Sequence, residues 1–247
     1  MFQNNPSPYG TRAFTLVEML LVVAIISILI GLLMPALGKA RDTSRITVCA
    51  SNQHQVYNAA AEYSAAHQRR LRLVDAGADV RERRFPYDTH TPNGPWMWDM
   101  TRDTATQLIA SAGGKVDIFF CPSNSDQNDN THWNYSGNYR VLGYFNLFKR
   151  ASGPMVNFTL AGGKQFVRSF GKQYDHATQE LFTDANLSVG GNFSQIWGGS
   201  PIPHRSSHLN RTTGLPTGGN ILFLDGHVAW RSFEQMSLRY WGPDHWF

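Results

Sequence analysis

The sequence predicts an α+β protein: one long N-terminal helix, its first half membrane-spanning and its second half amphipathic, packs on a C-terminal antiparallel β-sheet domain. Three observations predict this class. An apolar run covers residues 14–33, apolar or small residues then recur every three or four positions to about residue 67, and a hairpin pattern lies near the C-terminus. The 22 glycines, 12 prolines and 13% aromatic residues favour a loop-rich domain over a helical bundle.

The apolar run defines the first half of the predicted helix. From Phe14 to Leu33 its one charged residue is Glu18. At about 1.5 Å per residue this run spans about 30 Å, the thickness of the hydrocarbon core of a bilayer. An ionised carboxylate there costs a few kcal/mol unless it has a partner, and we expect no partner for Glu18 in its own helix. Cleavage between Ala13 and Phe14 would supply one, because the new α-amino group lies at the depth of Glu18.

The residues around this boundary resemble a known signal. Ala13-Phe14-Thr15-Leu16-Val17-Glu18, followed by an apolar helix with Pro35 inside it, resembles the class III signal of type IV pilins and type II secretion pseudopilins. The resemblance implies that a prepilin peptidase removes the leader and methylates Phe14. It also implies that Glu18 is an assembly contact between pilin or pseudopilin subunits, which meet through their N-terminal helices. Ala13 departs from the family pattern, where Gly is usual.

An ordinary secretory signal peptide or a plain signal anchor is the alternative. Residues 1–11 contain no Lys or Arg, the apolar run is longer than a typical signal-peptide core, and Glu18 interrupts it. These features favour the prepilin interpretation.

The expected domain organisation follows from this helix. Residues 1–13 form a leader peptide, residues 14–67 the long helix with its transmembrane half at 14–37, and residues 68–247 an extracytoplasmic β-rich globular domain. The expected location is the cytoplasmic membrane, with a single span and the C-terminal domain in the periplasm or in a surface fibre. A net charge of +4 and 16% charged residues carry no nucleic-acid signature.

Short elements are predicted within the C-terminal domain. The charged stretch 68–84 is expected to be a loop, and Gly113-Gly114 is expected to end a helix over 103–112. Strands or hairpins are expected at 116–120, 139–148, 155–170 and 180–183.

The clearest β signal is the last hairpin. Residues 218–224 form an apolar strand, Asp225 and Gly226 are the dipeptide that a type I′ turn favours, and residues 227–231 return. Asp225 and Gly226 therefore have a structural role as a turn. Ser232 with Gln235 predicts a capping box for a closing helix over 233–240.

This region carries a second resemblance. The segment GGNILFLDGHV, together with Cys49-Ala50-Ser51-Asn52, resembles pilin-like proteins with a C-terminal H-X9-DG processing-associated motif. The spacing departs from that pattern, because Leu215 stands ten positions before Asp225 and the nearest upstream histidine is His208. An insertion at 209–217 would account for the difference. The resemblance implies an architecture more than an activity.

Metal sites are weakly indicated, and we predict none. The strongest zinc or general-base constellation contains Asp184, His204, His208, Asp225 and His227. Prolines around the two upstream histidines favour a loop over the helix that would align them. Calcium is the other alternative, because Asp126, Asn128, Asp129 and Asn130 offer oxygen ligands, but the loop lacks the Gly and final Glu of an EF-hand. A solvated polar turn is the preferred interpretation, so no cofactor is expected.

Two cysteines complete the set of candidate residues. Cys49 and Cys121 are too few for a zinc knuckle and have no CxxC spacing. Outside the cytoplasm they could form a disulfide, which by loop-closure entropy would contribute about 4 kcal/mol. Two unpaired buried thiols are the alternative, and the sequence leaves both open.

The predicted function is structural. We expect a minor or specialised pilin-like subunit of a type IV pilus or type II secretion pseudopilus, and no enzymatic activity, since no G-x-S-x-G nucleophile elbow occurs. The alternatives are a membrane-anchored binding module that uses the pilin-type signal for sorting, and a membrane-tethered hydrolase.

Overall fold

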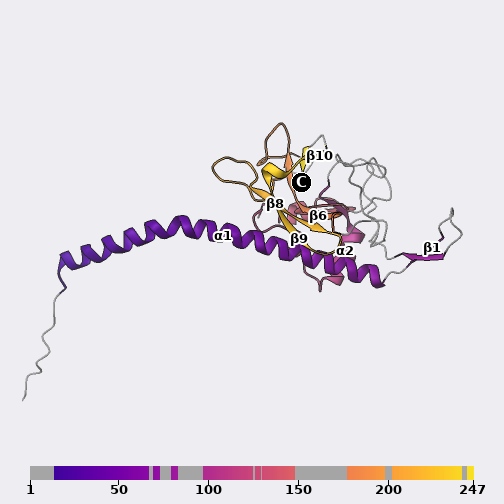
Figure 1. Ribbon diagram of the computed structural model, residues 1–247, viewed down its shortest axis with the longest axis horizontal. Helices are drawn as coiled ribbons and strands as arrows, with labels where there is room; N and C mark the ends of the chain where they lie inside the picture. The colour runs from indigo at the N-terminus through magenta and orange to yellow at the C-terminus, as the bar shows by residue number, and fades with distance from the viewer. Residues whose placement is uncertain are drawn as a thin grey trace, which may run out of the picture. The chain divides into compact units, whose positions relative to one another are not determined.

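The computed structural model describes most of the chain in two compact units, residues 1–43 and 44–247 (Figure 1). The predicted leader with Ala13 and the predicted hairpin 155–170 lie outside the described residues. Those described are 14–66, 69–72, 79–82, 97–124, 126–128, 130–147, 177–197, 202–240 and 244–247, with the backbone alone described for Ala66, 69–72, 79–82 and Tyr240.

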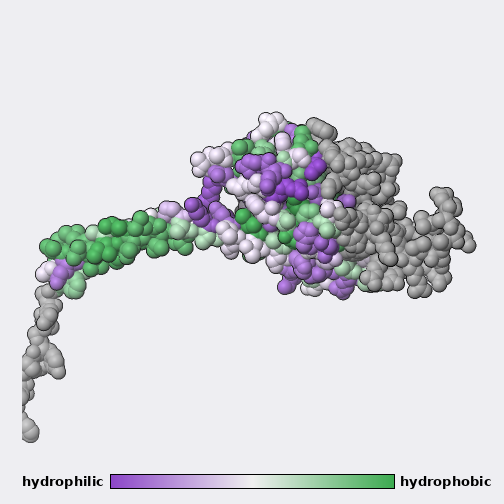
Figure 2. Space-filling view, viewed as in Figure 1, coloured by the Kyte–Doolittle hydropathy of each residue, from purple (hydrophilic) through white to green (hydrophobic). Residues whose placement is uncertain are grey.

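The long helix α1 runs from Leu16 to Ala66 without interruption, as predicted. Pro35 lies inside it, at a position where a proline removes one backbone hydrogen bond without ending the helix. Every residue from 14 to 44 is exposed, and the apolar side chains of this stretch form the green band in Figure 2. The first part of α1 is therefore apolar on all sides.

The second part of α1 buries one face. Its buried residues are spaced three or four apart, as on one side of a helix: Cys49, Gln53, Val56, Ala59, Ala60 and Ser64. Cys49, Val56, Ala59 and Ala60 pack in a core that also contains Tyr144, Phe182, Leu222 and Leu224. This half is the amphipathic helix that the sequence predicts.

The central sheet has four antiparallel strands in the order β5-β6-β8-β9. Their bounds are Tyr144–Asn146, Glu180–Asp184, Gly218–Phe223 and Val228–Ser232. All residues of β6 and β8 are buried, and each of these strands has a paired neighbour on both sides. One core contains the side chains of α1, and a second contains Trp98, Phe145, Leu187 and Phe247. The α+β class is confirmed.

Smaller elements surround this sheet. β3 pairs with β4, β7 and β10 pair with β11, and β1 pairs with β2, all antiparallel. The strands are β1 Arg69–Arg72, β2 Asp79–Glu82, β3 Asp99–Thr101, β4 Tyr139–Val141, β7 Asn186–Ser188, β10 Leu238–Tyr240 and β11 Asp244–Trp246. The short helices are α2 Arg102–Ser111, α3 Asn130–Trp133, η1 Asp117–Phe119 and η2 Phe233–Gln235.

Helix α2 matches the predicted helix over 103–112. The Thr101 side chain accepts a hydrogen bond from the Thr104 backbone N–H and caps its first turn. At its end Gly113 has φ +70°, and the Gly114 N–H bonds the Ile109 carbonyl at 2.8 Å. Glycine tolerates this left-handed conformation, so the helix stops where the Gly-Gly pair predicts.

Three local predictions were wrong. The strand predicted at 116–120 is instead the 3₁₀ helix η1 over Asp117–Phe119, because the N–H groups of Phe119 and Phe120 bond carbonyls three residues back instead of a neighbouring strand. The predicted loop 68–84 contains β1 and β2. The capping box of Ser232 and Gln235 is present, but only the turn η2 follows it, since β10 then pairs with β11.

The predicted C-terminal hairpin is formed by β8 and β9, but its turn is not type I′. A type I′ turn needs positive φ at both central residues, and the φ angle of Asp225 is not positive. The Phe223 carbonyl accepts from the Gly226 N–H at 3.0 Å, and the Phe223 N–H donates to the His227 carbonyl at 2.9 Å. Three residues therefore connect the strands, and Gly226, with φ +93°, is the left-handed one.

Gly226→Val should destabilise the globular domain by about 2 kcal/mol or more. A Cβ at Gly226 would lie 2.8 Å from the ring of Tyr57 on α1, and valine is strained at φ +93°. Asp225→Asn is the matched control, because its Oδ1 can still accept the His227 N–H, 3.0 Å away. Urea unfolding of the detergent-solubilised chain measures both. Equal midpoints for Gly226→Val and the parent would contradict the assigned turn.

Candidate functional site

The start of α1 is closed by a capping box. The Glu18 Oε2 atom accepts hydrogen bonds from the Thr15 N–H at 2.9 Å and from the Thr15 hydroxyl at 2.8 Å. In return the Thr15 Oγ1 accepts the Glu18 N–H at 3.3 Å. The expectation that Glu18 has no partner in its own helix was therefore wrong, because a neutral local partner exists. Its cationic partner stays a prediction.

The helix that follows has the length and composition of a membrane span. Among the described residues α1 is the one helix that is long and apolar enough to cross a bilayer. None of its apolar stretch is buried within the protein. A surface of this kind is stable only against lipid or against other apolar helices.

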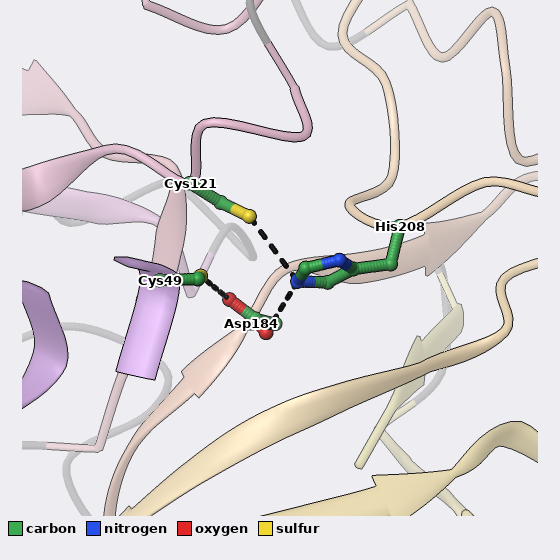
Figure 3. A group of neighbouring side chains, drawn as sticks. All are labelled: Cys49, Cys121, Asp184 and His208. Carbon is green, nitrogen blue, oxygen red and sulfur yellow. Dashed lines mark hydrogen bonds and ion pairs between the residues drawn. The ribbon is translucent and has the colours of Figure 1, made fainter. Parts of the chain in front are cut away.

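A second candidate site is a buried cluster in the globular unit. It consists of Cys49 on α1, Cys121 just after η1, Asp184 at the end of β6, and His208 in the loop before β8 (Figure 3). One ligand atom from each residue lies within 4.8 Å of all the others. All four residues are buried, with 6% or less of the surface of each exposed.

The contacts within the cluster converge on one point. The Cys49 thiol donates to Asp184 Oδ1 at 2.8 Å. The His208 Nε2 atom lies 3.2 Å from Cys121 Sγ and 3.0 Å from Asp184 Oδ2. Figure 3 shows the imidazole with this nitrogen facing the sulfurs and the carboxylate. Four potential metal ligands of three chemical kinds therefore face a common centre.

Neighbouring polar groups hold the carboxylate of Asp184. Its Oδ2 accepts from the Asn220 backbone N–H at 2.6 Å and from the Asn220 side-chain amide at 3.2 Å. Its Oδ1 accepts from the Gln53 side-chain amide at 3.3 Å. A carboxylate buried at 1% exposure needs such donors, because an unpaired charge in this environment is very costly.

The titration of the cluster reflects the proximity of its members. Burial, followed by hydrogen bonding to Cys121 and the charge of Asp184, raises the pKa of Cys49. Burial alone would also raise the pKa of Cys121, but hydrogen bonds to Cys49 and His208 outweigh it and lower this pKa to about 6. Burial lowers the pKa of His208, yet the charge and hydrogen bond of Asp184 raise it to about 10. The histidine therefore forms an ion pair with Asp184.

The cluster accounts for only some of the predicted site residues. Cys49 and Cys121 are both present as free thiols, so the disulfide stays a prediction. Of the zinc candidates, Asp184 and His208 belong to the cluster. Asp225 and His227 instead pair with each other at 2.6 Å on the exposed hairpin turn.

His204 lies in a separate aromatic stack. Its ring centroid lies 4.2 Å from the ring centroid of Trp98 and 4.2 Å from that of His132, and both pairs are stacked. Its Nδ1 is within 2.9 Å of the Gln127 side-chain amide. Burial, followed by the charge of His132, lowers the pKa of His204 to about 3. This histidine is a neutral core side chain.

The calcium candidates do not form a cluster among the described residues. Asp126 is exposed and pairs with Arg205 at 3.2 Å. Asn128 and Asn130 are also exposed, and Asn130 begins the short helix α3. Asp129 lies outside the described residues.

Sequence reasoning named all four cluster residues but did not bring them together. Cys49 and Gln53 stand four apart on α1, which places both on one helix face. Asp184 follows four residues of a buried strand. Both local patterns predict a polar side chain in the core. A buried polar group needs a hydrogen-bond partner, so each pattern indicates a second polar group nearby.

Comparison with known proteins identifies the N-terminal segment. The family model of the prokaryotic N-terminal methylation motif matches residues 10–34, which include the Ala13-Phe14 boundary and Glu18. The chain therefore carries the N-terminal methylation motif, which is consistent with a type IV pilin-like protein. Together with the apolar helix, this motif indicates a membrane-anchored chain that is processed by a prepilin peptidase and assembles with other pilin subunits. No curated protein and no solved structure matches the chain. The likeness to H-X9-DG proteins stays a prediction, since the matched residues end at 34.

The stability of the globular unit should depend on pH through His204. Its pKa of about 3 lies below the ordinary 6.5, so between these values the unfolded chain binds a proton that the folded chain does not. The contribution is complete above pH 6.5 and is lost as the pH falls toward 3. Between pH 5.5 and 4 this one proton should raise the unfolding constant about tenfold per pH unit.

The variant His204→Phe tests this assignment, because it keeps a ring in the stack and removes the titrating group. Urea unfolding between pH 5.5 and 4 gives the free energy of unfolding as a function of pH. The slope of this dependence should correspond to about one proton fewer in the variant than in the parent. His227→Gln, at an exposed histidine, is the control and should keep the parent's slope. An unchanged slope in His204→Phe would contradict the neutral state of His204.

Proposed function

We propose that this protein is a structural subunit, minor or specialised, of a type IV pilus or a type II secretion pseudopilus. In this proposal residues 1–13 are removed, the first part of α1 anchors the mature chain in the cytoplasmic membrane, and the globular unit lies outside the cytoplasm. The observation that carries the proposal is the methylation motif at 10–34, which continues directly into the exposed apolar helix.

The exposed apolar surface of α1 supports assembly through the helix. Before assembly, lipid can cover residues 14–37 on every side. In a fibre the same surface can pack against helices of other subunits, which replaces lipid contacts with protein contacts. Pilin-like assembly therefore needs no second hydrophobic surface on the globular unit.

Glu18 supports a head-to-tail register between subunits. The capping box engages Glu18 Oε2, and a carboxylate has further lone pairs that can accept bonds from a cation. Cleavage before Phe14 creates an α-amino group one residue before Thr15. In low-dielectric surroundings the ammonium of an incoming subunit and the Glu18 carboxylate of its neighbour attract strongly.

The length of the chain favours a minor or specialised subunit. After removal of 13 residues from 247, the mature chain has 234. That is longer than a compact major pseudopilin needs.

Processing is tested by the N-terminus of the mature protein. Mass spectrometry of chain extracted from membranes of cells with an active prepilin peptidase should find N-methyl-Phe14 as the first residue. The same cells lacking the peptidase provide the control and should yield the unprocessed chain. An intact N-terminal leader in the peptidase-positive cells would refute the prepilin assignment.

Assembly is tested by separating the charge of Glu18 from its capping role. Glu18→Gln keeps an acceptor for Thr15 but removes the charge, and Glu18→Leu removes both. Both variants should insert into membranes, and both should be depleted at least about tenfold from sheared fibres, in keeping with loss of a buried charge pair. Quantitative blotting of the fibre and membrane fractions measures this.

Thr15→Ala is the matched control, since it removes the capping hydroxyl and leaves the carboxylate. It should assemble close to the level of the parent. If Glu18→Gln assembles as well as the parent, the charge of Glu18 is not an assembly contact. If the parent itself is found only in membranes and never in fibres, the binding-module alternative replaces the structural one.

A further inference from the structure

We propose that Cys49, Cys121, Asp184 and His208 bind one zinc ion in the core of the globular unit. Zinc in structural sites takes four ligands in a closed tetrahedron, drawn from cysteine sulfur, histidine nitrogen and carboxylate oxygen. The cluster offers two sulfurs, one nitrogen and one oxygen, each from a buried side chain. The two soft thiolates and the imidazole favour zinc over calcium or magnesium, which prefer oxygen ligands.

The spacing of the ligand atoms suits such a tetrahedron. With zinc–sulfur bonds of about 2.3 Å and zinc–nitrogen or zinc–oxygen bonds of about 2.0 Å, the ligand atoms lie about 3.3–3.8 Å apart. In the cluster the contact between Cys49 Sγ and Asp184 Oδ1 is 2.8 Å, and all separations are within 4.8 Å. Reaching the zinc geometry therefore requires these separations to change by a few tenths of an ångström up to about 1 Å.

The geometry excludes a Cys-His-Asp catalytic relay. In a relay the histidine uses one ring nitrogen toward the nucleophile and the other toward the carboxylate. Here Cys121 and Asp184 both contact Nε2 of His208. A single nitrogen facing both groups cannot pass a proton between them, but it is the atom that would bind an ion at their common centre. The burial of all four residues also leaves no access for a substrate.

The surrounding groups are those that support metal ligands. Gln53 and Asn220 donate to the Asp184 oxygens and fix the carboxylate. Each sulfur also has a hydroxyl neighbour, Tyr144 at 3.5 Å from Cys49 and Ser123 at 2.9 Å from Cys121. These hydroxyls can donate to thiolates, which stabilises the form of cysteine that binds zinc.

The backbone of His208 provides an independent observation. His208 has φ +51° and is the one non-glycine residue with positive φ in the described part of the chain. This conformation is held by three bonds: its N–H donates to Ser123 Oγ at 3.0 Å, and its carbonyl accepts from the Thr217 N–H and hydroxyl at 2.9 and 3.0 Å. Such a conformation is retained where the side chain has a specific position to reach, and here it directs Nε2 into the cluster.

Zinc here would join four distant parts of the chain. The ligands come from α1, from the segment after η1, from β6 and from the loop before β8. An ion that binds the folded chain and not the unfolded one stabilises it by mass action. The site is thus structural, and it is independent of the function proposed for the N-terminal segment.

Metal analysis of the full-length chain in detergent tests the proposal. Elemental mass spectrometry should find one zinc ion per molecule in chain that is purified without chelator. Cys121→Ser and Asp184→Asn should contain at least about tenfold less, and the outer variant Gln53→Leu should bind zinc about 10- to 100-fold more weakly in competition with a chelator. His227→Gln, a histidine outside the cluster, should keep the full zinc content.

Cobalt tests the parent chain itself, so the result does not depend on the folding of any variant. Apoprotein loaded with Co²⁺ should show the visible bands of tetrahedral cobalt and a thiolate charge-transfer band, and Zn²⁺ should displace both. Chelation should lower the thermal midpoint of the parent, and zinc should restore it, while Cys121→Ser should respond to neither.

Alkylation separates this site from a disulfide, because both need the same sulfurs. Freshly isolated protein, denatured with a chelator and without reductant, should be labelled at both cysteines. Labelling of neither cysteine, restored by a reductant, would show a bond between Cys49 and Cys121 and would overturn the zinc site. Two labelled thiols in a chain that holds no zinc and takes up neither Zn²⁺ nor Co²⁺ would overturn it as well.

Discussion

The buried carboxylate of Asp184 is the interaction on which the globular unit depends. An ionised group at 1% exposure is tolerated only if several donors surround it. Those donors come from each major element: Cys49 and Gln53 on α1, Asn220 on β8, and His208 in the loop before β8. The Asp184 carboxylate is therefore stabilised only when helix, sheet and loop are packed correctly. Another register of the helix on the sheet would remove donors from this carboxylate and is disfavoured.

The same arrangement explains why α1 can serve two environments. From residue 14 to residue 44 every side chain is exposed, and beyond residue 44 the buried residues follow one helix face. Asn220 bonds the Ile46 carbonyl with its side-chain amide at 3.1 Å, and Gly226 leaves space for the ring of Tyr57. Two points of the β8–β9 hairpin therefore hold the second part of the helix. The first part is held by its backbone hydrogen bonds and a few local side-chain bonds, such as the capping box of Thr15 and Glu18, until lipid or another helix covers it.

The features that depend on local patterns could be predicted from the sequence. The apolar run, the three- to four-residue spacing of α1 and the glycines that end α2 each follow from neighbours in the chain. The apolar strand and the Asp-Gly pair predict the hairpin but not its turn type. The number of residues in the loop depends on which residues of β8 and β9 form the last pair. For a similar reason the strand predicted at 116–120 was wrong: a short segment with four apolar residues and Asp117 fits a buried 3₁₀ turn equally well.

The cluster could not be predicted in this way, since its four residues span 159 positions from Cys49 to His208. Spacing rules for metal sites apply to ligands on one turn or one helix, as in CxxC or HxxxH, and no pair in the cluster has such a spacing. What the sequence does contain is indirect: polar residues at positions where the pattern requires burial. Gln53 interrupts the apolar face of α1, Asp184 ends a buried strand and Asn220 lies in the middle of another. Each exception calls for a polar partner in the core, and all three lead to the same carboxylate. Polar residues on otherwise apolar faces, considered together, therefore indicate a shared buried site in this chain, whereas the spacing of its cysteines and histidines does not.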